Sequence, residues 1–224
     1  AGVPVIPVSV PYSLLSKDYL KLRFIYEEVC PGMIYAADAD MFAAPLASLD
    51  LAGVEIVVSQ DGATEQSTTP FGDLLATSVT SDVDRALAQV GAETVAKILY
   101  TSGSTGQPKP VLHTHGAFAT GSLNYGQHVL SLTASDCLYT PSRIFFAYGL
   151  HNLMLALQAG ASVLLAGPLP ADTSAGDVLE RHAVSVFMAV PATLKLAITR
   201  ARGPSRATSL RLCVSAGERL SMRL

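Results

Sequence analysis

The sequence has few charged residues and no excess of basic ones. Only 15% of its 224 residues are charged, whereas 50% are hydrophobic, and this balance excludes a disordered chain. Fifteen lysines and arginines stand against 18 aspartates and glutamates, which gives a formal net charge of −3. Binding to nucleic acid or to an anionic membrane calls for a basic face, so neither partner is expected.

Cysteine is also scarce. The three cysteines, Cys30, Cys137 and Cys213, lack the spacing of metal ligands, and an odd number argues against a disulfide framework. A reducing compartment is therefore expected, and we predict a cytoplasmic protein. Cys213 falls in a strand that we predict to be buried, where it would serve as a small apolar residue.

No hydrophobic run is long enough to cross a bilayer. The most apolar window, residues 153–167, is too short and is interrupted at residues 158–160, where we expect a helix to end at Gly160 and a strand to follow. The start of the chain has no basic segment before an apolar core, so no secretion signal is predicted. The chain opens on Ala1 without a methionine and stops at Leu224 in the middle of its strand and helix pattern, so we expect a piece of a longer protein.

Short β-rich runs alternate with helical patterns. Strands are predicted at residues 4–8, 33–36, 54–59, 96–100, 137–140, 161–165, 185–189 and 210–214. Helices are predicted at residues 17–29, 116–130, 149–158, 174–182 and 192–201. Because these strands are apolar along most of their length and alternate with helices, the sequence predicts an α/β fold of mostly parallel sheets covered by helices.

Two local expectations accompany this pattern. In the first helix, Leu22, Ile25 and Val29 form one apolar stripe, and Ser16 is the predicted N-terminal cap. Residues 60–94 are rich in Ser, Thr, Gly and Asp, which predicts a surface excursion with one short helix near residues 82–89.

The most informative stretch follows the predicted strand 96–100. It reads Thr101-Ser102-Gly103-Ser104-Thr105-Gly106-Gln107-Pro108-Lys109. Glycines let backbone N–H groups converge on an anion, hydroxyls add short donors, and the lysine adds a positive charge. The run therefore predicts a cradle for a polyphosphate, although a flexible turn remains the alternative. Its spacing is neither that of a Walker loop nor that of a dinucleotide fingerprint.

This run resembles the phosphate-loop signature of the adenylate-forming superfamily, which includes acyl-CoA synthetases, adenylation domains of peptide synthetases and luciferases. The resemblance implies that Thr101, Ser102, Gly103, Ser104, Thr105, Gly106 and Lys109 bind ATP. It also implies that Lys109 and Thr101 take part in catalysis and that Thr105 contacts magnesium. The family usually has glycine after the lysine, whereas this chain has Pro110, which lacks a backbone N–H.

Two further segments are similar to the same superfamily. Residues 145–150, FFAYGL, resemble the segment that lines the acyl pocket of benzoate-type CoA ligases. Residues 213–218, CVSAGE, resemble a turn that holds the adenine and closes the acyl pocket, which implies roles for Gly217 and Glu218 toward the nucleotide. The implied acid-binding residues are Phe146, Ala147, Tyr148, Ala216 and Gly217, and Phe145 is assigned to the core. The opening residues 1–22 resemble feruloyl-CoA synthetases.

The resemblance covers the whole chain but only the middle of the family's large N-terminal domain, so we expect residues 1–224 to be a single incomplete AMP-binding domain. The implied reaction joins a carboxylic acid to AMP at the expense of ATP with Mg²⁺, and coenzyme A then displaces AMP. The family's magnesium-binding glutamate, ribose-binding aspartate and C-terminal lid would lie beyond Leu224, so the chain alone is expected to be inactive.

Alternatives remain open at this point. The chain could come from an adenylation domain that loads a carrier protein, or from a non-catalytic nucleotide- or acyl-binding module. His113 and His115 could share one face of a strand and bind a metal, but no third ligand is near in the sequence. His151 could face the acyl group or solvent. The pair Asp38 and Asp40 is interpreted as a helix-capping loop.

Overall fold

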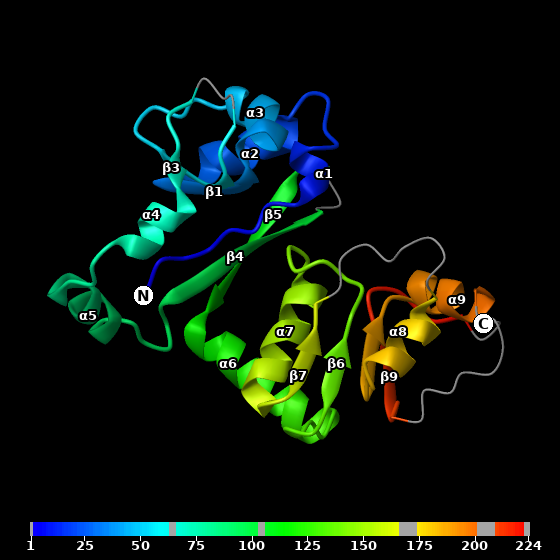
Figure 1. The fold of residues 1–224 in the computed structure, drawn as a ribbon. Coiled ribbons are helices and arrows are strands. Elements are labelled where there is room, and N and C mark those ends of the chain that lie inside the picture. Colours follow the sequence, from blue (N-terminus) through cyan, green and yellow to red (C-terminus); the bar gives the residue numbers. More distant parts are fainter. Residues whose placement is uncertain (1, 63–65, 103–105, 166–173, 201–208, 222–224) are drawn as a thin grey trace. The chain divides into compact units, whose positions relative to one another are not determined.

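The computed structural model describes residues 2–62, 66–102, 106–165, 174–200 and 209–221 (Figure 1). Contacts divide the chain into two compact units, Ala1–Thr114 and His115–Leu224. Each unit has its own sheets and its own buried core. The single incomplete domain expected from the sequence stays a prediction.

The first unit begins with helices and a small parallel sheet. Its elements are α1 (Val10–Ser13), α2 (Leu20–Val29), β1 (Met33–Asp38), α3 (Ala39–Ala47), β2 (Glu55–Gln60), β3 (Thr69–Pro70), α4 (Phe71–Ala76), α5 (Ser81–Ala88), β4 (Val95–Ser102) and β5 (Pro108–Thr114). Strands β1, β2 and β3 pair in parallel in that order.

Helix α3 covers this parallel sheet. Ala39 and Leu46 of α3 pack against Ala36 of β1 and against Ile56 and Val58 of β2, and all five are buried. The helix begins where expected, because the Asp38 carboxylate accepts a hydrogen bond from the Met41 N–H at 2.8 Å. The capping interpretation of this acidic pair is therefore confirmed for Asp38.

Strands β4 and β5 form a second, two-stranded sheet, and this sheet is antiparallel. No separate strand was predicted at residues 108–114, and β5 begins with Pro108 and includes Pro110, a residue that is uncommon inside sheets. The strand predicted at residues 4–8 is wrong, since the structure has only an isolated bridge there, between Val5 and Lys97.

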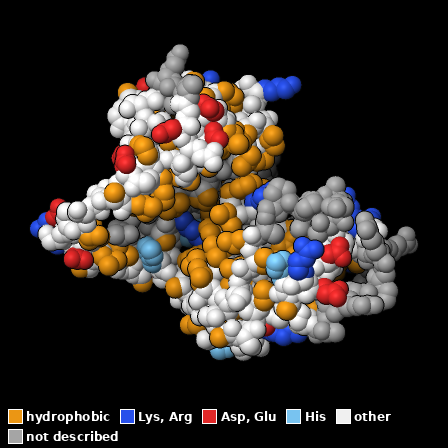
Figure 2. Space-filling view, in the orientation of Figure 1, with side chains coloured by type: hydrophobic (Ala, Val, Ile, Leu, Met, Phe, Trp, Pro, Cys, Tyr) orange, Lys and Arg blue, Asp and Glu red, His pale blue; other side chains and the backbone are white. Residues whose placement is uncertain are grey.

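Two more predictions for this unit need correction. Ser16 does not cap α2, which begins at Leu20 behind Tyr19, and Tyr19 has a positive φ of 54°. The Ser16 hydroxyl instead accepts the Tyr19 N–H at 3.0 Å. Residues 60–94 contain β3, α4 and α5 rather than one short helix. Their exposure is as predicted, and Figure 2 shows hydrophobic and charged side chains together on the surface over α5.

The second unit is built on a four-stranded parallel sheet with the order β7-β6-β8-β9. Its elements are α6 (His115–Asn124), the π-helix η1 (Tyr125–Val129), β6 (Cys137–Tyr139), α7 (Ala147–Ala159), β7 (Ser162–Leu164), α8 (Ala175–Arg181), β8 (Val186–Ala189), α9 (Pro191–Thr199) and β9 (Leu212–Ser215). Helix α7 ends as predicted at Gly160, which has a φ of 67°.

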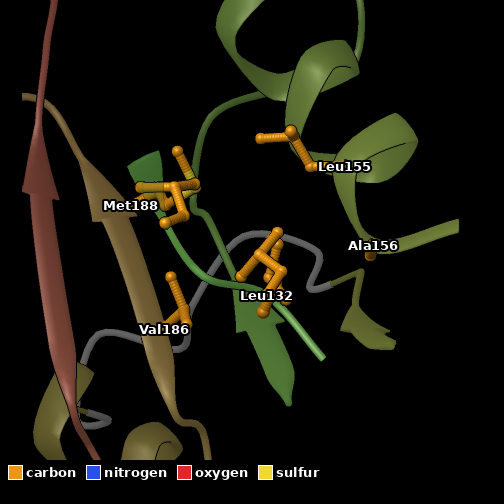
Figure 3. Packing of buried hydrophobic residues seen from close by; sticks show 7 residues of the cluster. Leu132, Leu155, Ala156, Val186 and Met188 are labelled. Carbon is orange, nitrogen blue, oxygen red and sulfur yellow. The ribbon is translucent and has the colours of Figure 1, made fainter. Parts of the chain in front are cut away.

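Both faces of this sheet are covered, as predicted. On one face, Leu138, Val186 and Met188 pack against Leu155 and Ala156 of α7 (Figure 3). On the other face, the core consists of Tyr139, Ala175, Val178, Leu179, Val184, Phe187 and Ala189. Successive residues of β6 and β8 thus alternate between two buried cores, so these strands read as continuous apolar runs.

The predicted helix 116–130 changes character part-way along. It is α-helical to Asn124 and continues as the π-helix η1. Among the described helices, none has the length and apolar character needed to span a membrane.

Candidate functional site

The predicted phosphate-binding run lies at the turn between β4 and β5 in the first unit. Thr101 and Ser102 end β4, and Lys109 is the second residue of β5. Gly106 is exposed and has a φ of 87°, in the region that favours glycine. Gly103, Ser104 and Thr105 lie outside the described residues, as does the side chain of Ser102.

The two ends of this turn are held side by side. Thr101 pairs with Lys109 in the antiparallel register, and the Thr101 hydroxyl donates to the Lys109 carbonyl at 3.4 Å. Both residues are exposed. The exposed ammonium group of Lys109 is available to an anion in solution, whereas the Thr101 hydroxyl is engaged with the Lys109 carbonyl.

The predicted acid-binding segment follows β6 in the second unit. Phe145 and Phe146 have ring centroids 4.6 Å apart, and Phe146 is 52% exposed. Phe145 is only half-buried, so its assignment to the core is wrong. Ala147 begins α7 and is exposed, which leaves Phe146 and Ala147 free of the packed interior.

Gly149 allows this segment to fold back closely on α7. A β-carbon at Gly149 would lie 2.2 Å from the carbonyl oxygen of Arg143 and 2.6 Å from that of Ser142. Gly149 is buried, and the Phe146 N–H donates to the Arg143 carbonyl at 3.0 Å. The glycine in the FFAYGL run is therefore required by packing.

Tyr148 joins the two segments assigned to the acyl pocket. Its hydroxyl donates to the Val214 carbonyl of β9 at 3.3 Å, and its own carbonyl accepts from the Asn152 amide at 2.9 Å. Burial, together with the nearby Tyr125, raises the pKa of Tyr148 to about 12, so the hydroxyl stays protonated at neutral pH. The hydroxyl is engaged with the backbone of β9.

The turn after β9 carries the other predicted site residues. Ala216 is half-buried, whereas Gly217 and Glu218 are exposed. Gly217 has a φ of 93°, and a β-carbon there would lie 3.3 Å from the Val190 side chain. Because β6, β8 and β9 are parallel neighbours, the residues that follow them share the carboxyl edge of the sheet, where such sheets commonly bind ligands.

A pocket of about 210 Å³ opens at the same edge, at the ends of β6 and β7. Its lining residues are Thr140, Ser142, Arg143, Ile144, Gly149, Leu153, Val163 and Leu165. The five predicted acid-binding residues are not among them. The sequence analysis missed this lining, because it comes from two strand ends and a helix that only the folded sheet brings together.

The other candidate residues from the sequence, three histidines and one cysteine, lie in different elements of the structure. His113 lies in β5 opposite Lys97, and His115 is the first residue of α6. Burial and the positive charge of Lys97 lower the pKa of His113. His151 stacks on Tyr125, with ring centroids 6.0 Å apart, and so packs within an aromatic cluster. Cys213 is exposed, since β9 is an edge strand, and its predicted burial is wrong.

The described residues include no group of three or more histidine, cysteine, aspartate or glutamate side chains that could hold a metal ion. Magnesium binding by Thr105 remains a prediction that lies outside the described residues.

Comparison with known sequences decides the family. Residues 8–224 match the profile of the family described as AMP-binding enzyme. The chain belongs to this family. The 4-hydroxybenzoate–CoA/benzoate–CoA ligase of Rhodopseudomonas palustris is 30% identical over 219 residues, which is 96% of this chain and 39% of that protein. The benzoate–CoA ligase of Thauera aromatica is 34% identical over 124 residues, 54% of this chain and 24% of that protein.

Solved structures agree with this assignment to the AMP-binding enzymes. An anthranilate CoA ligase in complex with anthranoyl-AMP superposes with a TM-score of 0.73 at 25% identity, covering 89% of this chain and 39% of that one. A benzoate CoA ligase from Burkholderia xenovorans gives a TM-score of 0.68 at 27% identity, covering 88% and 38%. The chain thus spans about two fifths of the length of these relatives.

Proposed function

We propose that the protein carrying this chain activates an aromatic carboxylic acid with ATP, forming an acyl-adenylate and then an acyl-CoA. The observation that carries the proposal is the run from Thr101 to Lys109 at the β4–β5 turn of a chain that belongs to the AMP-binding enzymes. The names of its relatives, which include benzoate–CoA and 4-hydroxybenzoate–CoA ligases, support the aromatic acid.

The proposed first step is attack of the substrate carboxylate on the α-phosphorus of ATP. A new bond joins the carboxylate oxygen to phosphorus, the bond to the β-phosphate oxygen breaks, and pyrophosphate leaves with that electron pair. Negative charge grows on the leaving group, so donors aimed at it lower the barrier. Thr101, Ser102, Gly103, Ser104, Thr105, Gly106 and Lys109 are the proposed donors and contacts. The substrate is already a carboxylate at neutral pH and needs no general base.

The proposed acid site consists of Phe146, Ala147, Tyr148, Ala216 and Gly217. Phe146 is exposed, and the Tyr148 hydroxyl is engaged with the Val214 carbonyl. Tyr148 would therefore present its ring, rather than a hydrogen-bonding hydroxyl, to the acid. Aromatic rings and small residues suit a flat apolar substrate.

Coenzyme A is the proposed acceptor in the second step, in which its thiolate attacks the acyl carbon and AMP leaves. Gly217 and Glu218 are proposed contacts of the nucleotide, and Thr105 is the proposed magnesium contact. Magnesium would offset charge on the phosphates when bound. A cytoplasmic location belongs to the same proposal and rests on the small, odd number of cysteines.

Acid-dependent exchange of labelled pyrophosphate into ATP tests the proposal. The assay would compare benzoate, 4-hydroxybenzoate, coumarate and ferulate, each with ATP and magnesium, in the 224-residue chain and in the longest natural protein that carries it. We expect exchange in the longer protein with at least one of these acids. Absence of exchange with all four acids would contradict the proposal and favour a binding module.

Thioester formation distinguishes an acyl-CoA ligase from an adenylation domain that loads a carrier protein. Adenylate formed by the active protein should be released as acyl-CoA when free coenzyme A is added. Exchange without acyl-CoA formation would instead favour an adenylation domain that loads a carrier protein.

A further inference from the structure

The β5 end of the phosphate-binding turn is poorly supplied with backbone donors. Lys109 lies between Pro108 and Pro110, and neither proline has a backbone N–H. Pro110 pairs with Tyr100 in the β4–β5 register, and Pro108 pairs with Ser102. Because Pro108 and Pro110 are two residues apart in an extended strand, their nitrogens lie on the same side of β5, and that side has no N–H to donate at these positions. The side-chain bond from Thr101 to the Lys109 carbonyl is long, at 3.4 Å.

A contact from outside the hairpin holds β4 at the same position. The Tyr100 hydroxyl donates to the Glu28 carboxylate at 2.7 Å, across 72 residues of sequence. Tyr100 directly precedes Thr101 and stands opposite Pro110. Burial and the Glu28 carboxylate both raise the pKa of Tyr100, so its hydroxyl remains a donor at neutral and moderately alkaline pH.

Helix α2, which carries Glu28, is itself fixed within the first unit. Ile25 of α2 is buried. The Arg23 guanidinium donates to the Ser48 carbonyl at 3.1 Å, and the Tyr26 hydroxyl donates to the Asp50 carbonyl. Both acceptors belong to the connection between α3 and β2. Glu28 is thus presented by a helix with three attachments of its own.

Helix α2 alone does not favour a carboxylate at the position of Glu28. Glu28 lies in the last turn of α2, where the partial negative charge of the helix end disfavours an acidic side chain. The hydrogen bond to Tyr100 gives this carboxylate a partner there.

We infer that Glu28 and Tyr100 are positioning residues that tie the end of β4 to α2 and so hold Thr101 beside Lys109. The pair adds an attachment from outside the hairpin to the end of β4, beyond the pairing with β5. The expected consequence for ATP rests on the proposed function, whereas the tie itself does not.

Amide hydrogen exchange tests the tie directly. The variants are Tyr100→Phe, which removes the donor, and Glu28→Ala, which removes the acceptor. Each should speed exchange about fivefold or more along β4 from residue 99 to residue 102 and along β5 near Lys109. The double variant should exchange no faster than either single one, because both remove the same bond. Glu28→Gln keeps an acceptor and should behave like the wild type.

Tyr35→Phe is the matched control. Tyr35 lies in β1, and its hydroxyl is 2.8 Å from the Ser59 hydroxyl, so this variant also deletes one phenolic hydrogen bond of the first unit. It should leave exchange along β4 and β5 unchanged. Unaltered exchange in Tyr100→Phe and Glu28→Ala, or equal acceleration in Tyr35→Phe, would overturn the inference.

Steady-state kinetics then distinguish a role of Glu28 and Tyr100 in positioning the ATP site from a general effect on the stability of the protein. In the longer protein, Tyr100→Phe and Glu28→Ala should raise the KM for ATP in pyrophosphate exchange about five- to tenfold and leave the KM for the acid unchanged. Equal changes in both constants would overturn the positioning role. If the wild type shows no exchange at all, the proposed function fails, and the hydrogen-exchange result still decides the tie between Glu28 and Tyr100.

Discussion

Lys109 is exposed on β5 and is the residue whose charge the proposed chemistry uses most directly. In the longer protein, Lys109→Ala should slow pyrophosphate exchange about 10²-fold, because it removes a cation from the departing pyrophosphate. Lys17→Ala is the control, since Lys17 is also exposed and lies outside the turn. An unchanged exchange rate in Lys109→Ala would remove the lysine from the mechanism.

Asp136 and Arg211 form the best-connected ion pair that the described residues show. The guanidinium donates to both carboxylate oxygens of Asp136, at 2.8 and 2.9 Å. The Ser185 hydroxyl and the Thr133 N–H donate to the same carboxylate. The Arg211 hydrogen bond is the main cause that holds the pKa of Asp136 well below its usual range, even though burial opposes it.

Removal of this guanidinium should therefore be costly. We expect Arg211→Ala to lower the free energy of unfolding by about 2–3 kcal/mol at pH 7, because the buried carboxylate loses its cation. Arg85→Ala should change it by less than about 1 kcal/mol, since Arg85 and its partner Asp82 are both exposed. Urea unfolding measures both effects.

The pH dependence supplies a check on this pair. The carboxyl pKa of Asp136 is lowered on folding, so the stabilisation is present above pH 4 and is lost as the pH falls further. Wild type and Arg211→Ala should thus converge in stability in acid. A constant difference between pH 7 and pH 3 would contradict this account.

At the scale of elements, the connection from β6 to α7 depends on one glycine. Gly149→Ala should destabilise the second unit by about 1–3 kcal/mol, because the new methyl group would meet the carbonyls of Arg143 and Ser142. Gly121→Ala in α6 is the control. Nothing lies within 4 Å of a β-carbon there, so this variant should gain up to about 1 kcal/mol of helix stability. Thermal unfolding that shifts both variants in the same direction would contradict the packing argument.

Helices and strands could be predicted where the spacing of apolar residues in the sequence matches the faces that are buried in the structure. The strands β6 and β8 are apolar runs between two covered faces, and the sequence locates them and the less buried β9 within about two residues. The β4–β5 hairpin escaped prediction as a pair, because the prolines of β5 disguise a strand that pairs on an exposed two-stranded sheet. The start of α2 was misjudged because Tyr19 adopts a positive φ that residue preference does not anticipate.

At the scale of the whole molecule, the buried Lys97 makes the free energy of unfolding vary with pH in the alkaline range. Lys97 is 7% exposed, and burial lowers its pKa to about 8. Between pH 8 and the pKa of an exposed lysine, the unfolded chain keeps a proton that the folded chain has lost, so this group raises stability as pH rises. Tyrosines with raised pKa values, such as Tyr148, act in the opposite sense at higher pH.

Comparison with Lys97→Met isolates this contribution. The wild type should gain about 2 kcal/mol over the variant in the free energy of unfolding between pH 7.5 and pH 9.5. Urea titrations at the two pH values measure it, and Lys17→Met, which alters an exposed lysine, should run parallel to the wild type. Parallel behaviour of Lys97→Met itself would contradict the predicted desolvation of this amine.

The α/β class, the covered parallel sheet and the family all follow from local features of the amino-acid sequence. Apolar periodicity is local, and the run from Thr101 to Lys109 carries its chemistry in consecutive residues. The tertiary structure decided which distant groups meet. It engages the Tyr148 hydroxyl with Val214, sets Glu28 against Tyr100 and places Cys213 on an exposed edge strand. Such contacts depend on strand order and on the packing of helices against sheets, and local sequence preferences specify neither.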